Sequence, residues 1–164
     1  MRDTMGLQAT RRAAGFTLIE LMVVVVVATI LLSIAIPSYM QQVRQSRRTE
    51  AKTAILDLAG REETYNATSG TGYTAVAASL GYVGFGVANP IGSGYYYIQV
   101  CSPASANCTP GLGMPNPPAA PSYTIVAIPL GTQVNDTQCT AFAVDSTGQQ
   151  YATGTLGTAQ CWSH

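Results

Sequence analysis

The chain has 164 residues, with eight Lys and Arg against eight Asp and Glu, so its formal net charge is zero. Every Lys and Arg lies at or before Arg61, and from Thr64 onward the only acidic residues are Asp136 and Asp145. Nucleic-acid binding requires clustered Lys and Arg that neutralise phosphates. We therefore expect no nucleic acid to be bound by a basic patch on the C-terminal part. The length leaves room for one modest domain plus a membrane anchor.

An apolar segment runs from Phe16 to Ile36, and Glu20 is its only charged residue. About 20 apolar residues are enough for a helix to cross a bilayer. Three arginines precede the segment, at Arg2, Arg11 and Arg12. Basic residues on this flank predict a cytoplasmic N-terminus and a single pass. A carboxylate inside such a segment costs about 2.5–3.5 kcal/mol on insertion scales, so a plain anchor gains nothing from Glu20.

Residues 1–15 form a short polar leader that allows three interpretations. A secretory signal would be cut after the apolar core, near Ala35, where Ser33-Ile34-Ala35 is similar to a signal-peptidase site. The Arg11-Arg12 pair indicates a twin-arginine signal. The third interpretation is cleavage before the apolar core, between Gly15 and Phe16.

The stretch from Gly15 to Val23, GFTLIELMV, resembles the class III signal of type IV pilins and pseudopilins. The resemblance implies that a prepilin peptidase cleaves after Gly15 and methylates the new N-terminal Phe16. It also implies that Glu20 is an assembly carboxylate, which pairs with the Phe16 amine of a neighbouring subunit. Buried charges are tolerated only when they are paired. The alternative is that Glu20 reaches back to the cytoplasmic interface.

Pro37 ends the apolar segment and predicts a helix kink, because proline removes one backbone hydrogen bond. Beyond it, apolar residues recur at spacings of three or four, which predicts an amphipathic continuation of the helix. They are Tyr39, Met40, Val43, Ala51, Ala54, Ile55, Leu58 and Tyr65. We expect a transmembrane and polymerisation half (16–37), an amphipathic half (38–67) and a globular domain (68–164).

Four basic residues follow the apolar segment, at Arg44, Arg47, Arg48 and Lys52. One interpretation is a solvated helix face with some i,i+4 pairing, in reach of lipid headgroups. The other is a set of charge contacts between subunits of a filament. The sequence does not decide between them.

After a Gly-rich connection over residues 70–94, four segments have strand character. They span residues 95–101, 123–128, 140–144 and 149–152, and Asp145-Ser146-Thr147-Gly148 predicts a hairpin turn between the last two. Close spacing of the strands indicates an antiparallel meander. We expect an α+β fold in which about four strands pack on the C-terminal half of the helix, which the pilin resemblance also implies.

Four cysteines, Cys101, Cys108, Cys139 and Cys161, all follow the apolar segment. This segregation favours an oxidising compartment and two disulfides in one of three pairings. Zinc is the alternative, although the chain has no CxxC pair. Residues 139–148 and 159–162 also resemble the C-terminal region of PilE-type minor pilins. That resemblance implies a disulfide between Cys139 and Cys161, which leaves Cys101 and Cys108 to close a small loop.

We find no plausible catalytic, cofactor or metal-binding constellation in the sequence, since the only histidine is the terminal His164. The resemblance implies a non-enzymatic minor pilin, most similar to the PilE type, which moves from the inner membrane into a pilus. Its C-terminal domain would be periplasmic before assembly. Its partners would be prepilin peptidase, the major pilin, other minor pilins and a tip adhesin, with roles in twitching motility, adhesion or DNA uptake. The alternatives are a pseudopilin of type II secretion and a membrane-anchored periplasmic binding module.

Overall fold

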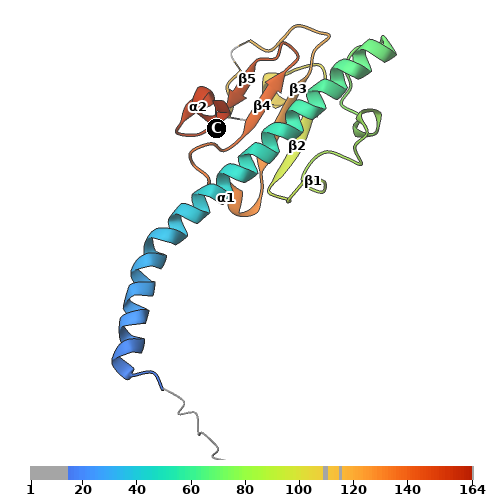
Figure 1. Cartoon of the computed structure of the whole chain (residues 1–164). Helices are drawn as coiled ribbons and strands as arrows, with labels where there is room; N and C mark the ends of the chain where they lie inside the picture. The colour runs from blue at the N-terminus through green and yellow to red at the C-terminus, as the bar shows by residue number, and fades with distance from the viewer. Residues whose placement is uncertain (1–14, 109–110, 115, 164) are drawn as a thin grey trace, which may run out of the picture. The chain divides into compact units, whose positions relative to one another are not determined.

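The computed structural model describes residues 15–108, 111–114 and 116–163. The chain divides into two compact units, Met1–Met40 and Gln41–His164. The long helix α1, Leu18–Ser69, contributes to both (Figure 1). It begins and ends about two residues later than the sequence pattern predicts.

In the first unit, α1 begins with a side-chain cap. The Thr17 hydroxyl accepts a hydrogen bond from the Glu20 backbone N–H at 3.2 Å, and the Leu21 N–H donates to the Thr17 carbonyl. A hydroxyl at this position satisfies one of the free N–H groups of the first turn. The described residues contain one helix, α1, that is long and apolar enough to cross a membrane.

In the second unit, five antiparallel strands pair in the order in which they occur along the chain. They are β1 (Pro90–Ile91), β2 (Tyr96–Cys101), β3 (Thr124–Pro129), β4 (Phe142–Asp145) and β5 (Gln150–Ala152). The four expected strands correspond to β2–β5. The expected number of strands was too low by one, because β1 has only two residues and starts with proline, which gives no strand signal.

Shorter elements connect the strands and end the described chain. Three 3₁₀ helices are η1 (Ala77–Leu80), η2 (Ala106–Cys108) and η3 (Gly131–Asn135). A second α-helix, α2 (Gly157–Ser163), follows β5. The sequence pattern did not predict α2, which contains Cys161.

The main core lies between the sheet and the part of α1 that belongs to the second unit (Figure 1). Ala51, Ile55 and Leu58 are fully buried there against side chains of β2, β3 and β4. Arg48 and Glu62 are buried on the same stripe of α1, seven residues before and after Ile55. The apolar stripe therefore ends in a charged side chain at each end.

The opposite face of the sheet carries a second, smaller apolar cluster. Val126 and Ala143 are buried there with Cys108 of η2, because alternate residues of a strand point to opposite faces. Leu112 and Tyr151 pack against this cluster. The segment after β2 therefore covers part of the sheet face that α1 leaves free.

Candidate functional site

The expected maturation segment lies at the start of the described chain. Gly15, Phe16 and Thr17 precede α1, and the Phe16 side chain is 84% exposed. A Cβ atom added at Gly15 would meet nothing within 4 Å. No packing contact in the structure therefore requires glycine at this position. The leader arginines, Arg2, Arg11 and Arg12, lie outside the described residues.

Glu20 lies in the first turn of α1, where its backbone N–H is capped by Thr17. The Thr-x-x-Glu spacing of these two residues is that of a capping box, a signal that the sequence interpretation above missed. The Thr29 and Ser33 hydroxyls each donate to a carbonyl of their own helix at 2.7 Å. The Glu20 carboxylate has no corresponding partner among the described residues.

Pro37 lies inside α1, and the helix continues beyond it to Ser69. Proline has no N–H to donate, so the carbonyl one turn earlier, at Ser33, loses its usual partner. The expected kink at Pro37 stays a prediction. The helix as a whole is not interrupted.

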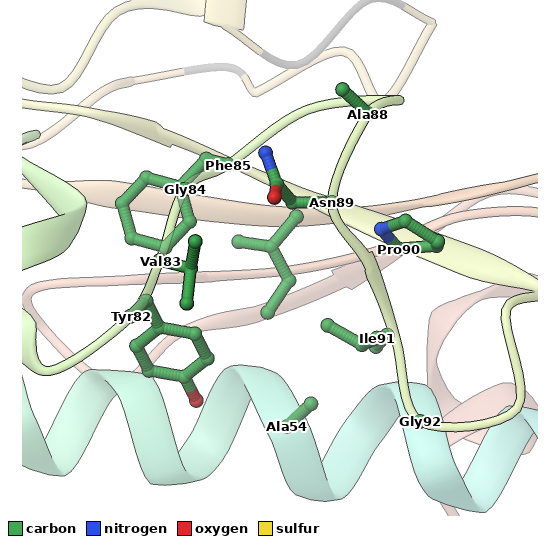
Figure 2. A pocket seen from close by; sticks show the side chains of 11 residues that line it. Ala54, Tyr82, Val83, Gly84, Phe85, Ala88, Asn89, Pro90, Ile91 and Gly92 are labelled. Atoms are coloured by element: carbon green, nitrogen blue, oxygen red, sulfur yellow. The ribbon is translucent and has the colours of Figure 1, made fainter.

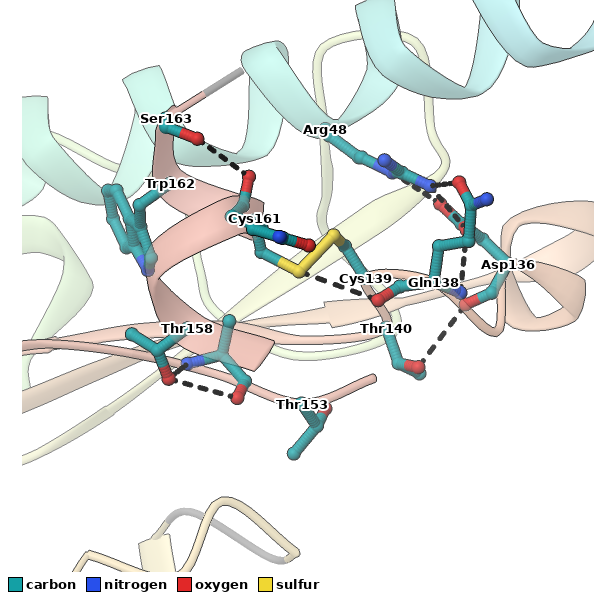
Figure 3. The surroundings of a disulfide bond; sticks show 12 residues. Arg48, Asp136, Gln138, Cys139, Thr140, Thr153, Thr158, Cys161, Trp162 and Ser163 are labelled. Carbon is teal, nitrogen blue, oxygen red and sulfur yellow. Dashed lines mark hydrogen bonds and ion pairs between the residues drawn. A yellow bond between two sulfur atoms is a disulfide. The ribbon is translucent and has the colours of Figure 1, made fainter. Parts of the chain in front are cut away.

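The basic residues after Pro37 have different environments. Arg48 is buried and forms a bidentate ion pair with Asp136, with both N–O distances at 2.7 Å. Its Nη2 also donates to Gln138 Oε1 at 3.0 Å, and Figure 3 shows the three side chains together beside the disulfide. Arg48 and Asp136 therefore neutralise each other inside the second unit. Asp136 also accepts hydrogen bonds from the Gln133 side chain and the Gln138 backbone N–H.

Two more cations of α1 are held by the sheet domain. The Arg47 guanidinium lies over the Tyr95 ring at 3.4 Å from the centroid and donates to Thr132. Lys52 is buried and donates from Nζ to the Cys161 carbonyl at 3.3 Å. Burial, and then the nearby Arg48 charge, lower the Lys52 pKa below its ordinary value. Both residues join α1 to segments that are distant in sequence.

The remaining two cations are more accessible. Arg61 pairs with Asp57 one turn earlier at 2.8 Å, and its Nη1 donates to the Leu80 carbonyl. Arg44 is half-buried, and no described carboxylate contacts it. Most of the basic cluster is therefore bound within the subunit, and Arg44 is the exception.

The structure pairs Cys139 with Cys161 and Cys101 with Cys108. The first bridge joins the segment before β4 to α2 (Figure 3), and the Trp162 indole N–H donates to the Tyr151 carbonyl beside it. The second bridge joins the end of β2 to η2. No described cysteine is free, and no described group of three His, Cys, Asp or Glu residues is placed to hold a metal ion.

Glu62 is a fully buried acid at the distal end of the α1 stripe. One carboxylate oxygen accepts the Thr74 backbone N–H at 3.1 Å, and the other, Oε1, has no hydrogen-bond partner. Burial raises the Glu62 pKa most, the Glu63 charge raises it further, and the Thr74 hydrogen bond lowers it. Beside it, the Tyr73 hydroxyl donates to Glu63 and its ring packs edge-on against Tyr123.

An apolar groove opens between α1 and the connection that leads into β1 (Figure 2). Its volume is about 600 Å³, and Tyr82, Phe85, Ile91 and Ala54 line it. Val83, at its edge, is 100% exposed. The Gly-rich connection therefore presents an apolar surface.

Two family models match the chain. Residues 10–36 match the prokaryotic N-terminal methylation motif, which covers the expected cleavage site and Glu20. Residues 37–143 match the model described as type IV minor pilin ComP, DNA uptake sequence receptor. No curated protein matches the chain.

These matches agree with the long helix, the antiparallel sheet and the resemblance of the GFTLIELMV stretch. They indicate a structural subunit that interacts with other pilins and functions in connection with DNA uptake. Because the family description names a DNA receptor, the expectation that no nucleic acid is bound by a basic patch on the C-terminal part is not supported. With the larger match extending over residues 37–143, the chain belongs to the type IV minor pilin ComP family.

Proposed function

We propose that the chain is a precursor that prepilin peptidase cleaves between Gly15 and Phe16 and methylates at Phe16. The mature subunit then enters a type IV pilus through residues 16–37. Support comes from the methylation-motif match over residues 10–36 and from the exposed Phe16 in a non-helical segment. Before assembly, the apolar segment anchors the subunit in the inner membrane with residues 38–164 on the periplasmic side.

The observation that carries this proposal is the Glu20 carboxylate, which lies in an apolar helix without a described partner. Cleavage creates an α-amino group on Phe16, and methylation leaves its charge in place. In a filament, the Phe16 amine of one subunit can neutralise Glu20 of the next. Removing one member of a buried pair costs about 3–5 kcal/mol, which is enough to select subunits by axial register.

The test is to express the full chain together with a prepilin peptidase and measure the intact mass of the membrane-bound product. We expect a chain that starts at Phe16 and carries one added methyl group. A start at Ile36, or an uncut leader, would favour a secreted or plainly anchored domain and contradict the proposal.

Assembly is tested separately with Glu20→Gln, which keeps the shape of the side chain and removes its charge. We expect filament incorporation to fall at least about tenfold, as loss of a buried partner predicts. Thr29→Val is the matched control in the same helix, because the Thr29 hydroxyl bonds only to its own helix. Equal incorporation of Glu20→Gln and Thr29→Val would contradict an assembly role for Glu20.

We further propose that the subunit takes part in DNA uptake, as the ComP family description supports. Direct DNA contact by this chain would have few cations to use, because no Lys or Arg follows Arg61 and Arg48 is neutralised by Asp136. Arg44, which contacts no described carboxylate, and the exposed Arg61, which pairs with Asp57, are the accessible cations of the second unit. The chain would therefore bind DNA mainly through uncharged donors and aromatic side chains.

Salt dependence distinguishes this mode of binding from an ordinary phosphate clamp. With about two phosphate contacts, the affinity for a DNA duplex should fall by only about tenfold between 50 and 200 mM salt, whereas six to ten contacts lose about 10³–10⁵. The full chain in detergent and a labelled duplex are sufficient for the measurement. A steep salt dependence would contradict the proposed mode, and an absence of binding would leave DNA contact to other subunits.

A further inference from the structure

Arg44 lines a polar hollow at one end of the second unit. The hollow has a volume of about 390 Å³ and lies between α1 and the segment that precedes β4. Gln45 and Arg48 of α1 contribute to its wall, and so do Thr137 and Gln138 from the other side. All of these residues belong to the second unit.

Two side chains in the wall of this hollow, Arg44 and Gln138, have donors that no described acceptor uses. Asp136 behind it already accepts from Arg48, from the Gln133 side chain and from the Gln138 backbone N–H. Gln138 Oε1 accepts from Arg48, which leaves the Gln138 Nε2 amide without a described acceptor. Together with the Arg44 guanidinium, this amide can donate to an anion.

The charges along α1 also favour an anion at Arg44. Arg44 is three residues before Arg47 and four before Arg48, spacings that place like charges side by side on a helix and destabilise it. Arg48 has Asp136 as its counter-ion and Arg47 has the face of Tyr95. Arg44 has neither kind of partner among the described residues. A bound anion would offset the repulsion between Arg44 and the neighbouring Arg47 and Arg48.

We propose that this hollow, centred on Arg44, binds the phosphate group of an anionic phospholipid headgroup while the subunit resides in the membrane. Arg44 is eight residues after Ile36, where the apolar segment ends, and belongs to the same helix. Anchoring through that span keeps headgroups at high local concentration near the start of the second unit. A membrane therefore supplies phosphate groups close to Arg44.

The test uses native mass spectrometry of the full chain in detergent with an equimolar mixture of phosphatidylglycerol and phosphatidylcholine. The ratio of the two lipids that stay bound reports the preference for an anionic headgroup. Arg44→Gln should lower this ratio about fivefold, the effect expected for one basic residue at a membrane surface. Arg61→Gln is the control, because Arg61 already has Asp57 as its partner. Thermal unfolding of each variant verifies that it is folded.

An unchanged lipid ratio in Arg44→Gln would overturn the proposal, and so would an equal decrease in Arg61→Gln. A parallel measurement with a DNA duplex distinguishes binding of a lipid phosphate from binding of a DNA phosphate. If Arg44→Gln weakens duplex binding and leaves the lipid ratio unchanged, the hollow is a DNA contact and the lipid assignment is wrong. The start of the mature chain is measured separately, so either result leaves the maturation proposal standing.

Discussion

Arg48 and Asp136 form a buried, bidentate ion pair between residues 88 positions apart in the sequence. The pair fixes the end of α1 that enters the second unit to the loop between η3 and β4. Gln133 and Gln138 complete its hydrogen bonds on the sheet side. Burying two charges is tolerable here because each has the other and several neutral partners.

Removing one member of this pair should be strongly destabilising. We expect Arg48→Met to lower the free energy of unfolding by about 3–5 kcal/mol, because Asp136 stays buried without a counter-ion. Combining it with Asp136→Leu should restore part of the loss. Urea unfolding of the chain in detergent measures both variants. A single variant as stable as wild type would show that the pair is dispensable.

The stability of the second unit should fall as the pH rises above the ordinary Glu pKa of 4.5, because burial raises the Glu62 pKa in the folded chain. Above that pH the unfolded chain releases the proton first, so stability decreases until the pH passes the folded pKa. Glu62→Gln should remove this contribution, because Gln stays neutral and still accepts the Thr74 N–H. Unfolding free energies of both chains between pH 4 and pH 8 measure the difference. A difference that does not change with pH would contradict the prediction.

The two disulfides should differ in their effect on stability. The chain-entropy relation gives about 3 kcal/mol for Cys139–Cys161 and about 2 kcal/mol for Cys101–Cys108, because the first closes the longer loop. Cys139→Ser with Cys161→Ser, and the corresponding double variant of the other pair, avoid leaving a free thiol. Thermal unfolding without reductant measures both. The prediction is wrong if removing Cys101–Cys108 lowers the unfolding temperature more than removing Cys139–Cys161.

Gly154 should tolerate no side chain. Its φ is +131°, and an added Cβ would collide with the Gln138 carbonyl, so Gly154→Ala should destabilise the fold by at least about 1–3 kcal/mol. Gly60 is the matched control, because it is exposed in α1 with nothing within 4 Å of an added Cβ. Gly60→Ala should stabilise the chain by up to about 1 kcal/mol. Equal effects of the two substitutions would contradict this account.

The sequence was sufficient to predict the elements that carry a strong local signal. Ala51, Ile55 and Leu58 predict the packed face of α1, and short runs rich in β-branched and aromatic residues, with a turn signal before the last of them, predict β2–β5. β1 and α2 were missed because two residues of strand and seven of Gly-, Thr- and Ser-containing helix carry too little local signal. Tertiary contacts therefore determine whether β1 and α2 form.

The interaction partners of the basic residues on α1 could not be predicted, because they too depend on tertiary contacts. Arg44, Arg47 and Arg48 look alike in the sequence, yet only Arg48 finds Asp136, and only Arg47 finds Tyr95. Each arginine's partner is distant in the sequence: Tyr95 is 48 positions from Arg47, and Asp136 is 88 positions from Arg48. Only the folded chain brings these residues together. Glu20, in contrast, can be identified from the sequence alone, because it is the one charged residue of the apolar segment.

The Arg61–Asp57 pair on α1 affects the susceptibility of this subunit to trypsin-like proteases. Trypsin-like enzymes cut after Lys or Arg, and the chain offers them no such bond beyond Arg61. Arg61 itself is held in a helix by its pairing with Asp57 and the Leu80 carbonyl. The whole sheet domain, with both of its disulfides, therefore survives such enzymes as one piece. The same property makes the subunit easy to undercount in surveys of pilus composition that rely on short tryptic peptides.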